Sequence, residues 1–286
     1  MRWIKSTGDL FVFGNFLIAI STVTLATQTQ FELLSQLVYR PYYIVVFFAT
    51  FFVYNLHRYL GVMGDPDHPS GRNTWSKKNI VSVKIFIVLS FLILMGSTLF
   101  LLREIGWLLI PLCLITLSYS IPIFRKKGKY IRLRDITWMK TFLIALVWTL
   151  VTVYLPALRE KVDLIARNVS MMALERFLFV FAITIPFDIR DAEDDRRKGV
   201  ISLAVDLGEQ KSKKLAYLLI GLCMLVSIVH YHNFPGKLLA MGLSLLGATV
   251  LTAKSDPQRN DYFFLLGLDG LMILQSVVFI LLGHLH

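Results

Sequence analysis

The sequence predicts an all-α protein, a polytopic membrane helical bundle with about nine transmembrane helices. Two observations carry this prediction: 56% of the 286 residues are hydrophobic with a mean hydropathy of +0.63, and only 17% are charged. A soluble domain has about 45–50% apolar and about 25% charged residues. The formal net charge is +11, from 30 Lys+Arg and 19 Asp+Glu. High hydropathy excludes a disordered chain, and the scarcity of wettable surface argues against a nucleic-acid-binding module. A membrane protein with basic loops fits both observations.

Nine apolar stretches account for most of the chain. Each is nearly free of charge, as a helix that crosses a bilayer must be, and a crossing takes about 20 residues. In order they are roughly Leu10–Ala26, Pro41–Met63, Ile80–Leu102, Ile105–Ile123, Ile136–Leu155, Met171–Phe187, Leu215–Tyr231, Leu238–Thr252 and Tyr262–Leu285. A soluble protein with many buried helices is the alternative, but nine such runs leave no polar faces to contact water. Without repeats or low-complexity linkers, we expect one domain over residues 1–286.

The N-terminus and the cysteines exclude two other interpretations. Arg2 and Lys5 before an apolar run are similar to a secretory signal, but the run from Leu10 is long for one and lacks a small-x-small cleavage site. We therefore expect an uncleaved first span. Cys113 and Cys223 both lie inside apolar runs, which predicts neither a disulfide framework nor a metal cluster.

The basic residues between the stretches predict the topology. The N-terminus and the connections after the second, fourth, sixth and eighth stretches hold 20 Lys+Arg, whereas the other connections hold 6. Cytoplasmic loops carry the excess of Lys and Arg. The N-terminus is therefore predicted to be cytoplasmic, and an odd number of spans places His284–His286 outside. In a bacterium this membrane would be the inner membrane.

The acidic run after the sixth stretch is the most informative segment. Asp188, Asp191 and Asp195 are spaced i, i+3 and i+7, so a helix would place them on one face. Carboxylates this close stay ionised only beside a metal ion or basic groups. Oxygen ligands of this kind suit Mg²⁺, which takes one or two carboxylates plus substrate phosphates. A solvated loop of mixed charge is the alternative. Ionisable residues at the end of a span favour a functional site.

The same segment is similar to a family motif. Asp191-x-x-x-Asp195-Arg196, then Gly199 and an apolar stretch closing on Leu207-Gly208, resembles the second aspartate motif of the UbiA-type intramembrane prenyltransferases. The form R-D-A-E-D-D-R-R-K-G is closest to the naphthoate branch of that superfamily, in the menaquinone (quinone) pathway. Nine spans with the motif loops on the cytoplasmic side also match.

A second motif extends the resemblance over most of the chain. Tyr119-Ser120-x-Pro122 ends the fourth stretch and is followed by Arg125, Lys126 and Lys127. It resembles a Tyr-x-x-Pro turn that, in this family, precedes a basic residue near the diphosphate. The resemblance therefore implies that Tyr119, Arg125 and Lys126 contact substrate.

The resemblance implies a fold and a reaction. The helices would surround a central cavity open laterally to lipid, where two aspartate motifs hold Mg²⁺ and an isoprenyl diphosphate. Asp191 and Asp195 would be catalytic and, with Asp188, metal-binding. The activity would be Mg²⁺-dependent transfer of the isoprenyl chain to a lipophilic, aromatic acceptor in the membrane. The partners would be the prenyl diphosphate, the acceptor and membrane lipid, with no nucleic acid.

The first motif departs from the family's approximate N-D-x-x-D-x-x-x-D. Asn55 fits, but Leu56, Tyr59 and Met63 stand where acids are expected. Asp65 and Asp67 follow later, around Pro66. Three outcomes stay open: Asp65 or Asp67 takes over a metal position, His57 and Arg58 contact phosphate directly in place of one metal, or the site no longer performs the family's chemistry. We expect Asn55, His57 and Arg58 to bind substrate.

Other candidates are isolated charges. Lys140 enters an apolar stretch five residues after Asp135, and either faces the cavity and binds substrate or reaches water. Asp269, deep in the last stretch, is expected to face the cavity. Arg72, Lys77 and Lys78 would neutralise diphosphate or attract anionic lipid.

Two other function classes compete with the enzyme. A non-catalytic relative that binds a prenyl lipid or a quinone would explain the missing acids of the first motif. A transporter would show paired helices broken by Gly or Pro, and no such pairing is evident.

Overall fold

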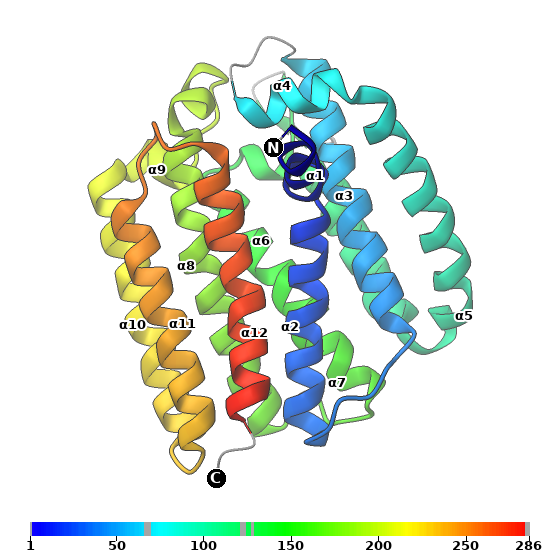
Figure 1. Ribbon diagram of the computed structural model, residues 1–286, viewed down its shortest axis with the longest axis vertical. Coiled ribbons are helices and arrows are strands. Elements are labelled where there is room, and N and C mark those ends of the chain that lie inside the picture. The colour runs from blue at the N-terminus through cyan, green and yellow to red at the C-terminus, as the bar shows by residue number, and fades with distance from the viewer. Residues whose placement is uncertain (1, 66–69, 121–123, 127–128, 284–286) are drawn as a thin grey trace.

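The computed structural model describes residues 2–65, 70–120, 124–126 and 129–283. The side chains of residues 2–6, 100–105, 117, 120, 124, 126, 129–131 and 135 are not part of that description. The long helices run side by side along one bundle (Figure 1). The predicted all-α membrane bundle is confirmed. We call the end of the bundle that carries α4 (Gly71–Lys78) the α4 end, and the opposite end, with α7 (Leu155–Arg159), the α7 end.

The chain follows a simple order along this bundle. The remaining elements are α1 (Arg2–Phe13), α2 (Phe16–Leu34), α3 (Tyr42–Gly64), α5 (Ile80–Ser120), β1 (Phe124–Lys126), β2 (Lys129–Ile131), η1 (Leu133–Asp135), α6 (Met139–Thr149), η2 (Leu150–Tyr154), α8 (Arg167–Arg197), α9 (Leu203–Leu207), α10 (Glu209–Tyr231), α11 (Pro235–Lys254), η3 (Phe263–Asp269) and α12 (Gly270–Leu282). Elements α6, η2 and α7 follow one another as one span over residues 139–159, and η3 with α12 forms the last span.

In the described part of the chain, seven helical segments are long and apolar enough to cross a membrane, and the bent pair α1–α2 makes an eighth. The fourth predicted stretch contains a shorter apolar helical segment, Gly106–Thr116. Nine is therefore an approximate count of the spans.

Helix α5 contains two apolar segments that run in opposite directions. Its first segment starts beside the end of α3, to which the short α4 connects it. Leu108 then packs in a cluster with residues 42–46, at the start of α3. Tyr119 lies with its ring centroid 5.4 Å from that of His57, near the end of α3 again. The chain therefore returns along α3, and Tyr119 comes back to the α4 end.

The first predicted span begins later than expected, because the chain bends at Gly14. The axes of Thr7–Phe13 and α2 differ by 59°. The amide of Gly14 donates to the Leu10 carbonyl at 2.9 Å, and a Cβ on Gly14 would lie 2.2 Å from that oxygen. Asn15 then takes a left-handed conformation with φ 66°, which asparagine tolerates better than most residues. The straight span starts at Phe16 and not at Leu10.

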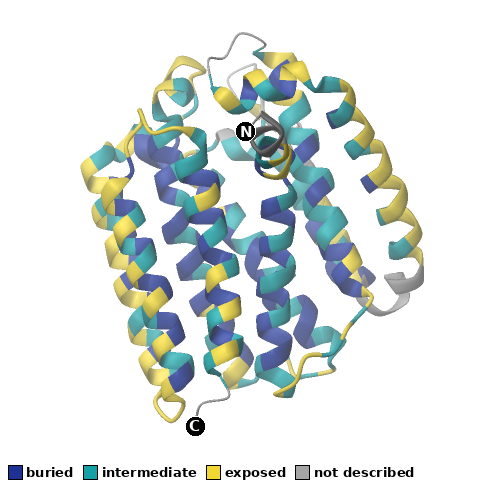
Figure 2. Cartoon of the chain, viewed as in Figure 1, coloured by how far each residue is buried: buried dark blue, intermediate teal, exposed yellow. Residues whose placement is uncertain are grey.

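Helix α8 is the centre of the bundle. It packs against α6 and α10, and 67% of its apolar window is buried, compared with 11% for residues 80–99 of α5. Figure 2 shows the same contrast between the inner helices and the outer ones, whose exposed apolar side chains suit contact with lipid. The predicted stretch Met171–Phe187 is longer than expected and continues as a helix through Arg197. The helical spacing of Asp188, Asp191 and Asp195 is confirmed.

Several buried hydroxyl groups find a hydrogen-bond acceptor within their own helices. The side chains of Ser21, Thr22, Thr149 and Thr152 each donate to the carbonyl four residues earlier, at 2.7–2.9 Å. In hydrocarbon, an unpaired polar group has no water to replace its partner. These local hydrogen bonds let the bundle keep small polar residues between closely packed helices.

The predicted same-side connections meet at the α4 end. Tyr262 donates to Asp9, Trp138 donates to Asp206, and the Lys198 ammonium lies 3.4 Å from Asp65 Oδ2. The Arg72 amide also donates to Asp261 Oδ2 at 2.9 Å. These contacts link the five segments that hold 20 of the 30 basic residues, directly or through the residue that follows a segment. The grouping predicted from charge agrees with these contacts, and the cytoplasmic assignment of this end stays a prediction.

One short β-hairpin departs from the all-α prediction. Strands β1 and β2 are antiparallel, with Arg125 opposite Tyr130. Three-residue strands carry too little alternation to be seen in a basic loop, so the pattern of charge and hydropathy did not reveal them.

Candidate functional site

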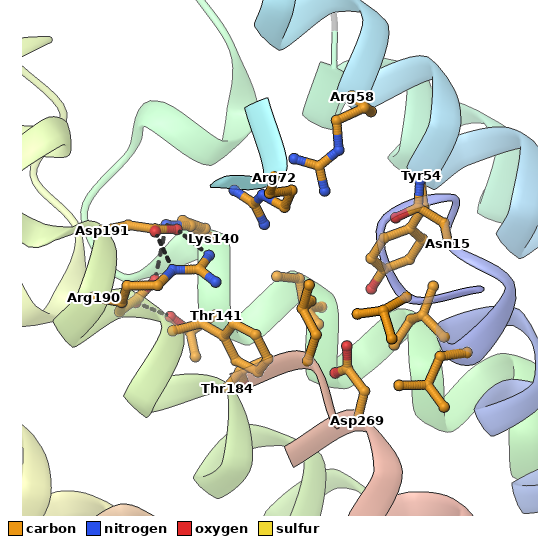
Figure 3. Close-up of a pocket in the computed structure, with 17 residues that line it drawn as sticks. Asn15, Tyr54, Arg58, Arg72, Lys140, Thr141, Thr184, Arg190, Asp191 and Asp269 are labelled. Carbon is orange, nitrogen blue, oxygen red and sulfur yellow. Dashed lines mark hydrogen bonds and ion pairs between the residues drawn. The ribbon is translucent and has the colours of Figure 1, made fainter. Parts of the chain in front are cut away.

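A cavity of about 150 Å³ lies inside the bundle toward the α4 end. Its polar lining comes from many parts of the chain: the α1–α2 bend, α3, α4, α6, α8 and η3 (Figure 3). The charged residues that line it are Arg58, Arg72, Lys140, Asp188, Arg190, Asp191 and Asp269. Four cations thus face three carboxylates around one small space.

Lys140 lies among the three aspartates of the acidic run. Its Nζ is 2.9 Å from Asp188 Oδ1, 3.2 Å from Asp195 Oδ2 and 3.8 Å from Asp191 Oδ2. Thr141, the next residue, donates to Asp188 Oδ2 at 2.5 Å. Because α6 begins at Met139, its first turn presents both side chains to α8. Of the two alternatives left open for Lys140, the structure has the one in which it lines the cavity, and its ammonium neutralises the acidic face.

Arg190 holds Asp191 from the same helix. Its Nε lies 2.8 Å from Asp191 Oδ1 and its Nη2 lies 3.3 Å from Oδ2, a bidentate contact. Its Nη1 is 3.6 Å from Asp261 Oδ1. The guanidinium also lies over the rings of Phe187 and Phe264, at 5.2 and 5.1 Å from their centroids, which is a favourable arrangement for a cation. The sequence alone did not indicate this role for Arg190, because its stacking partner Phe264 is distant in the chain.

Arg58 and Arg72 bring positive charge without matched acids. Arg58 comes from α3 and Arg72 from α4, and Figure 3 shows both guanidinium groups directed toward the space that Arg190 also faces. The Nε of each is buried and has no hydrogen-bond partner among the described residues. Burial, and secondly the positive charge of Arg190, lowers the pKa of Arg72. Buried donors of this kind are costly unless a ligand pairs with them.

The other predicted residues of the first motif lie elsewhere. Asn55 is buried, accepts a hydrogen bond from Asn15 at 3.2 Å and donates to the carbonyls of Phe51 and Gly14. It therefore fastens the α1–α2 bend, and neither it nor His57 lines the cavity. The ring of His57 instead contacts Tyr119. The expected direct contact of Asn55 and His57 with substrate has no support in this placement and stays a prediction.

The loop candidates are dispersed. Asp65 pairs with Lys198 at the surface of the α4 end, 3.4 Å away. Asp67 lies outside the described residues, and so does the side chain of Lys126. Arg125 is exposed on β1, and the Arg134 guanidinium lies 5.8 Å from the Tyr119 ring centroid. Of the described side chains, Asp65, Arg125 and Arg134 do not line the cavity.

Some lining residues carried no signal in the sequence. Asn15, Tyr54, Thr141 and Thr184 line the cavity, yet each is a single polar residue in an apolar helix, a pattern shared with the many hydroxyl groups that bond to their own backbone. Asp269, predicted to face the cavity, does line it. For Arg72 the sequence left two interpretations open, contact with diphosphate and attraction of anionic lipid, and the structure places Arg72 in the cavity lining.

The donor set does not present a ready metal site. Among the described residues, no group of three or more His, Cys, Asp or Glu side chains is arranged to hold a metal ion. The acidic face of α8 is instead engaged by the Lys140 ammonium, and Asp191 is also paired with Arg190. A metal ion would have to displace Lys140 to reach Asp188 and Asp195. The residues as placed therefore do not fit Mg²⁺, although the family generally uses Mg²⁺-bound diphosphate substrates.

The fold and the cavity define a polytopic helical membrane protein with an ionic site near one end of its bundle. The profile of the UbiA prenyltransferase family matches residues 63–273, which is more than half of the chain. The chain belongs to this family. The matched range includes the second aspartate motif and begins after the Asn55–Tyr59 segment, where the first motif is altered.

Two solved structures share the fold. A structure of digeranylgeranylglyceryl phosphate synthase in membranes is 20% identical, with 99% of both chains covered and a TM-score of 0.55. A UbiA homologue from Archaeoglobus fulgidus is 11% identical over 94% of this chain and 98% of that chain, with a TM-score of 0.59. No curated protein sequence matches.

Proposed function

We propose that the protein transfers an isoprenyl group from a prenyl diphosphate to a lipophilic acceptor inside the membrane. The observation that carries this proposal is the cavity, in which Arg58, Arg72 and Arg190 face one space in a bundle of the UbiA prenyltransferase family. Guanidinium groups bind phosphate oxygens with charge-assisted, often bidentate hydrogen bonds. The naphthoate branch, an aromatic acceptor and a role in quinone biosynthesis remain predictions from the second motif.

The reaction requires the diphosphate to leave and the cation to be captured. The bond between the allylic carbon and the diphosphate oxygen breaks, and its electron pair leaves with the diphosphate. The arginines stabilise the charge that develops on the leaving group. An aromatic acceptor carbon then forms the new carbon–carbon bond and releases its proton to water.

Each cavity residue has a part in this scheme. Asp191 fixes Arg190 through its bidentate contact, and Asp188 with Thr141 fixes Lys140. Phe187, which lines the cavity and lies under Arg190, presents a ring face that favours a nearby cation. In this scheme Asp191 and Asp195 position the cationic groups, and their catalytic and metal-binding roles stay predictions from the second motif.

A reconstitution assay tests the proposal. The full chain in lipid nanodiscs would be given prenyl diphosphates of several lengths with a panel of aromatic acceptors, and prenylated product and released diphosphate would be measured by mass spectrometry. We expect both products to appear with wild type and to fall when Asp191→Asn and Asp195→Asn are combined. Arg197→Met is the matched control, because this α8 side chain is 62% exposed. Equal turnover by the double variant would contradict the role of the two aspartates.

The second candidate is a non-catalytic protein that binds a prenyl lipid or a quinone. It is favoured by one observation: the acids of the first motif are missing, and Asn55 packs against the α1–α2 bend instead. Saturable binding of donor without release of diphosphate for any acceptor would favour this second function.

A further inference from the structure

The charge pairing in the cavity is uneven, and this unevenness identifies the chemistry of the ligand. Lys140 is in contact with three carboxylates, and Arg190 has Asp191 and Asp261 within 4 Å. Arg58 and Arg72 form no ion pair within the described part of the chain, and the Nε of each, like Nη1 of Arg190, is buried there without a hydrogen-bond partner. Asp269 is the remaining carboxylate that lines the cavity. Three guanidinium groups with unsatisfied donors around one space suit an anion that offers several oxygens.

The acidic face of α8 is already neutralised from within the protein. The Lys140 ammonium lies within 3.2 Å of an oxygen of Asp188 and of Asp195, and Asp188 uses its second oxygen to accept from Thr141. A divalent cation at this position would compete with a tethered ammonium that is held by the first turn of α6. Lys140 therefore occupies the place where a metal ion would otherwise bridge carboxylates and phosphate.

From these contacts we infer that this chain binds the diphosphate group of its ligand without a metal ion, through Arg58, Arg72 and Arg190, while Lys140 serves as the built-in counter-ion of Asp188, Asp191 and Asp195. The inference rests on the proposed function for the identity of the ligand, and it departs from the metal dependence that the family implies. Figure 3 shows the convergence on which it depends: the three guanidinium groups come from α3, α4 and α8 and point into one space.

The size of the cavity agrees with a headgroup. Pockets that enclose a whole drug-sized ligand measure about 300–1,000 Å³, whereas this cavity measures about 150 Å³. The arginines surround the space directly, so the diphosphate would fill it and the isoprenyl chain would lie outside. Free inorganic diphosphate offers the same phosphate oxygens to the arginines. The experiment must therefore distinguish binding of inorganic diphosphate from binding of a prenyl diphosphate.

Binding of a non-hydrolysable farnesyl thiodiphosphate to the full chain in lipid nanodiscs, measured by calorimetry, tests the inference. We expect its Kd in EDTA to stay within about threefold of its Kd in Mg²⁺, because the cations are part of the chain. Inorganic diphosphate should bind more weakly, and farnesol should not compete. Competition by farnesol as effective as that of the analogue would overturn the headgroup assignment.

Variants locate the cations that matter. Arg58→Met should weaken analogue binding in EDTA by at least about tenfold, or about 1.4 kcal/mol, and Arg58→Lys should restore part of the loss. Arg197→Met, a change to an α8 side chain that is 62% exposed, is the matched control and should bind as wild type does. Wild-type affinity of Arg58→Met would overturn the assignment.

Lys140→Met gives the most specific result. Without the ammonium, Asp188 and Asp195 lose their cationic partner, whereas Asp191 keeps Arg190. We expect binding in EDTA to fall by at least about tenfold and Mg²⁺ to restore it. Unchanged binding by Lys140→Met in EDTA would contradict the role of Lys140, and Lys140→Arg, which keeps the charge, should bind without metal.

The wild-type protein separates this inference from the proposed function. Loss of analogue binding in EDTA with recovery in Mg²⁺ would overturn the inference and leave the prenyl-transfer proposal intact. Absence of binding in both conditions, by a protein that is folded by its thermal unfolding profile, would overturn both.

Discussion

The bundle buries a cluster of ionisable side chains at each end. The two clusters differ in how far their charged groups are paired and in the volume of the cavity beside them. At the α4 end, four cations and three carboxylates line a cavity of about 150 Å³. At the α7 end, Glu32, Glu175, Arg176 and Tyr231 line a space of only about 10 Å³, and His230 contacts the two glutamates beside it. The first end has guanidinium donors without partners among the described residues and room for a ligand, whereas the second has room for little more than one water molecule.

The α7 cluster is paired in part, because Arg176 Nη1 and Glu175 Oε1 have no hydrogen-bond partner among the described residues. His230 Nδ1 lies 3.2 Å from Glu175 Oε2, and the Tyr231 hydroxyl lies 2.9 Å from Glu32 Oε2 and 3.1 Å from Glu175 Oε2. A hydroxyl group has one hydrogen, so one of these two contacts requires a proton on a glutamate. The comparison teaches that burial of charge does not by itself define a binding site. Surplus charge of one sign next to open volume does.

The largest expected effect comes from replacing the cavity arginines at the α4 end, compared with a buried arginine at the α7 end. Arg58→Met combined with Arg72→Met should lower kcat/KM for the prenyl donor by about 100-fold or more, because two charge-assisted contacts of about 1.5–3 kcal/mol each are lost. Arg176→Met at the α7 end should leave the KM for the donor unchanged. Steady-state kinetics in nanodiscs measures both, and a similar loss in Arg176→Met would show that the α7 cluster also serves the ligand.

The second prediction compares two buried carboxylates. Asp188 is 2% exposed and Glu175 is 4% exposed, and each contacts a cationic or hydroxyl partner. Asp188→Asn and Glu175→Gln should each reduce the free energy of unfolding by about 1–3 kcal/mol, because a buried partner loses its contact. Turnover should fall by about tenfold only in Asp188→Asn, since Lys140 would lose its closest partner. Chemical denaturation and product assays on the same samples separate the two effects, and equal turnover losses would contradict the distinction.

A third prediction concerns the bend that shapes the cavity wall. Gly14→Ala places a Cβ 2.2 Å from the Leu10 carbonyl oxygen, whereas Gly8 has open space around a Cβ position. Gly14→Ala should therefore reduce stability by about 1–3 kcal/mol as the helix shifts to relieve the overlap. Gly8→Ala, in the same helix, should be neutral. Thermal unfolding of the pair decides the point, and equal midpoints would show that the bend tolerates a side chain.

The smallest expected effect lies outside the membrane at the α7 end. Arg40 donates to both oxygens of Glu160, at 2.8 and 2.7 Å, and this hydrogen bonding lowers the pKa of Glu160 below its usual value. A carboxyl group with a lowered folded-state pKa stabilises the fold above its unfolded pKa, and that stability is lost as pH falls through the folded pKa. Glu160→Gln should unfold at a slightly lower temperature than wild type at neutral pH, and the difference should vanish in acid. A difference that persists at pH 3 would contradict this cause.

Much of the bundle was predictable because lipid imposes a strong constraint. The apolar stretches predicted the membrane spans, and the spacing of the acidic residues predicted that Asp188, Asp191 and Asp195 share one helical face. The bend at Gly14 was not predictable, because its cause is a hydrogen bond to Leu10 and a contact between Asn15 and Asn55, which are 40 residues apart. Short-range pattern carries no information about that pairing.

The site was predictable only in part for the same reason. The second motif identified one wall of the cavity, α8. That Lys140 reaches this wall depends on where α6 begins, just after Trp138 in a left-handed conformation with φ 64°. That Arg72 and not Asn55 faces the cavity depends on how α4 folds over the bundle, where the Arg72 amide donates to Asp261 across 189 residues.

The length of α8 sets the depth at which the chemistry takes place. Its 31 residues extend over about 46 Å at about 1.5 Å per residue, whereas the hydrocarbon layer is about 30 Å thick. The last turns, from Asp188 onward, therefore reach the headgroup layer while the earlier turns stay among acyl chains. A donor anchored by its tail would arrive by lateral diffusion with its phosphates already at the right height, and its charge would never have to enter hydrocarbon.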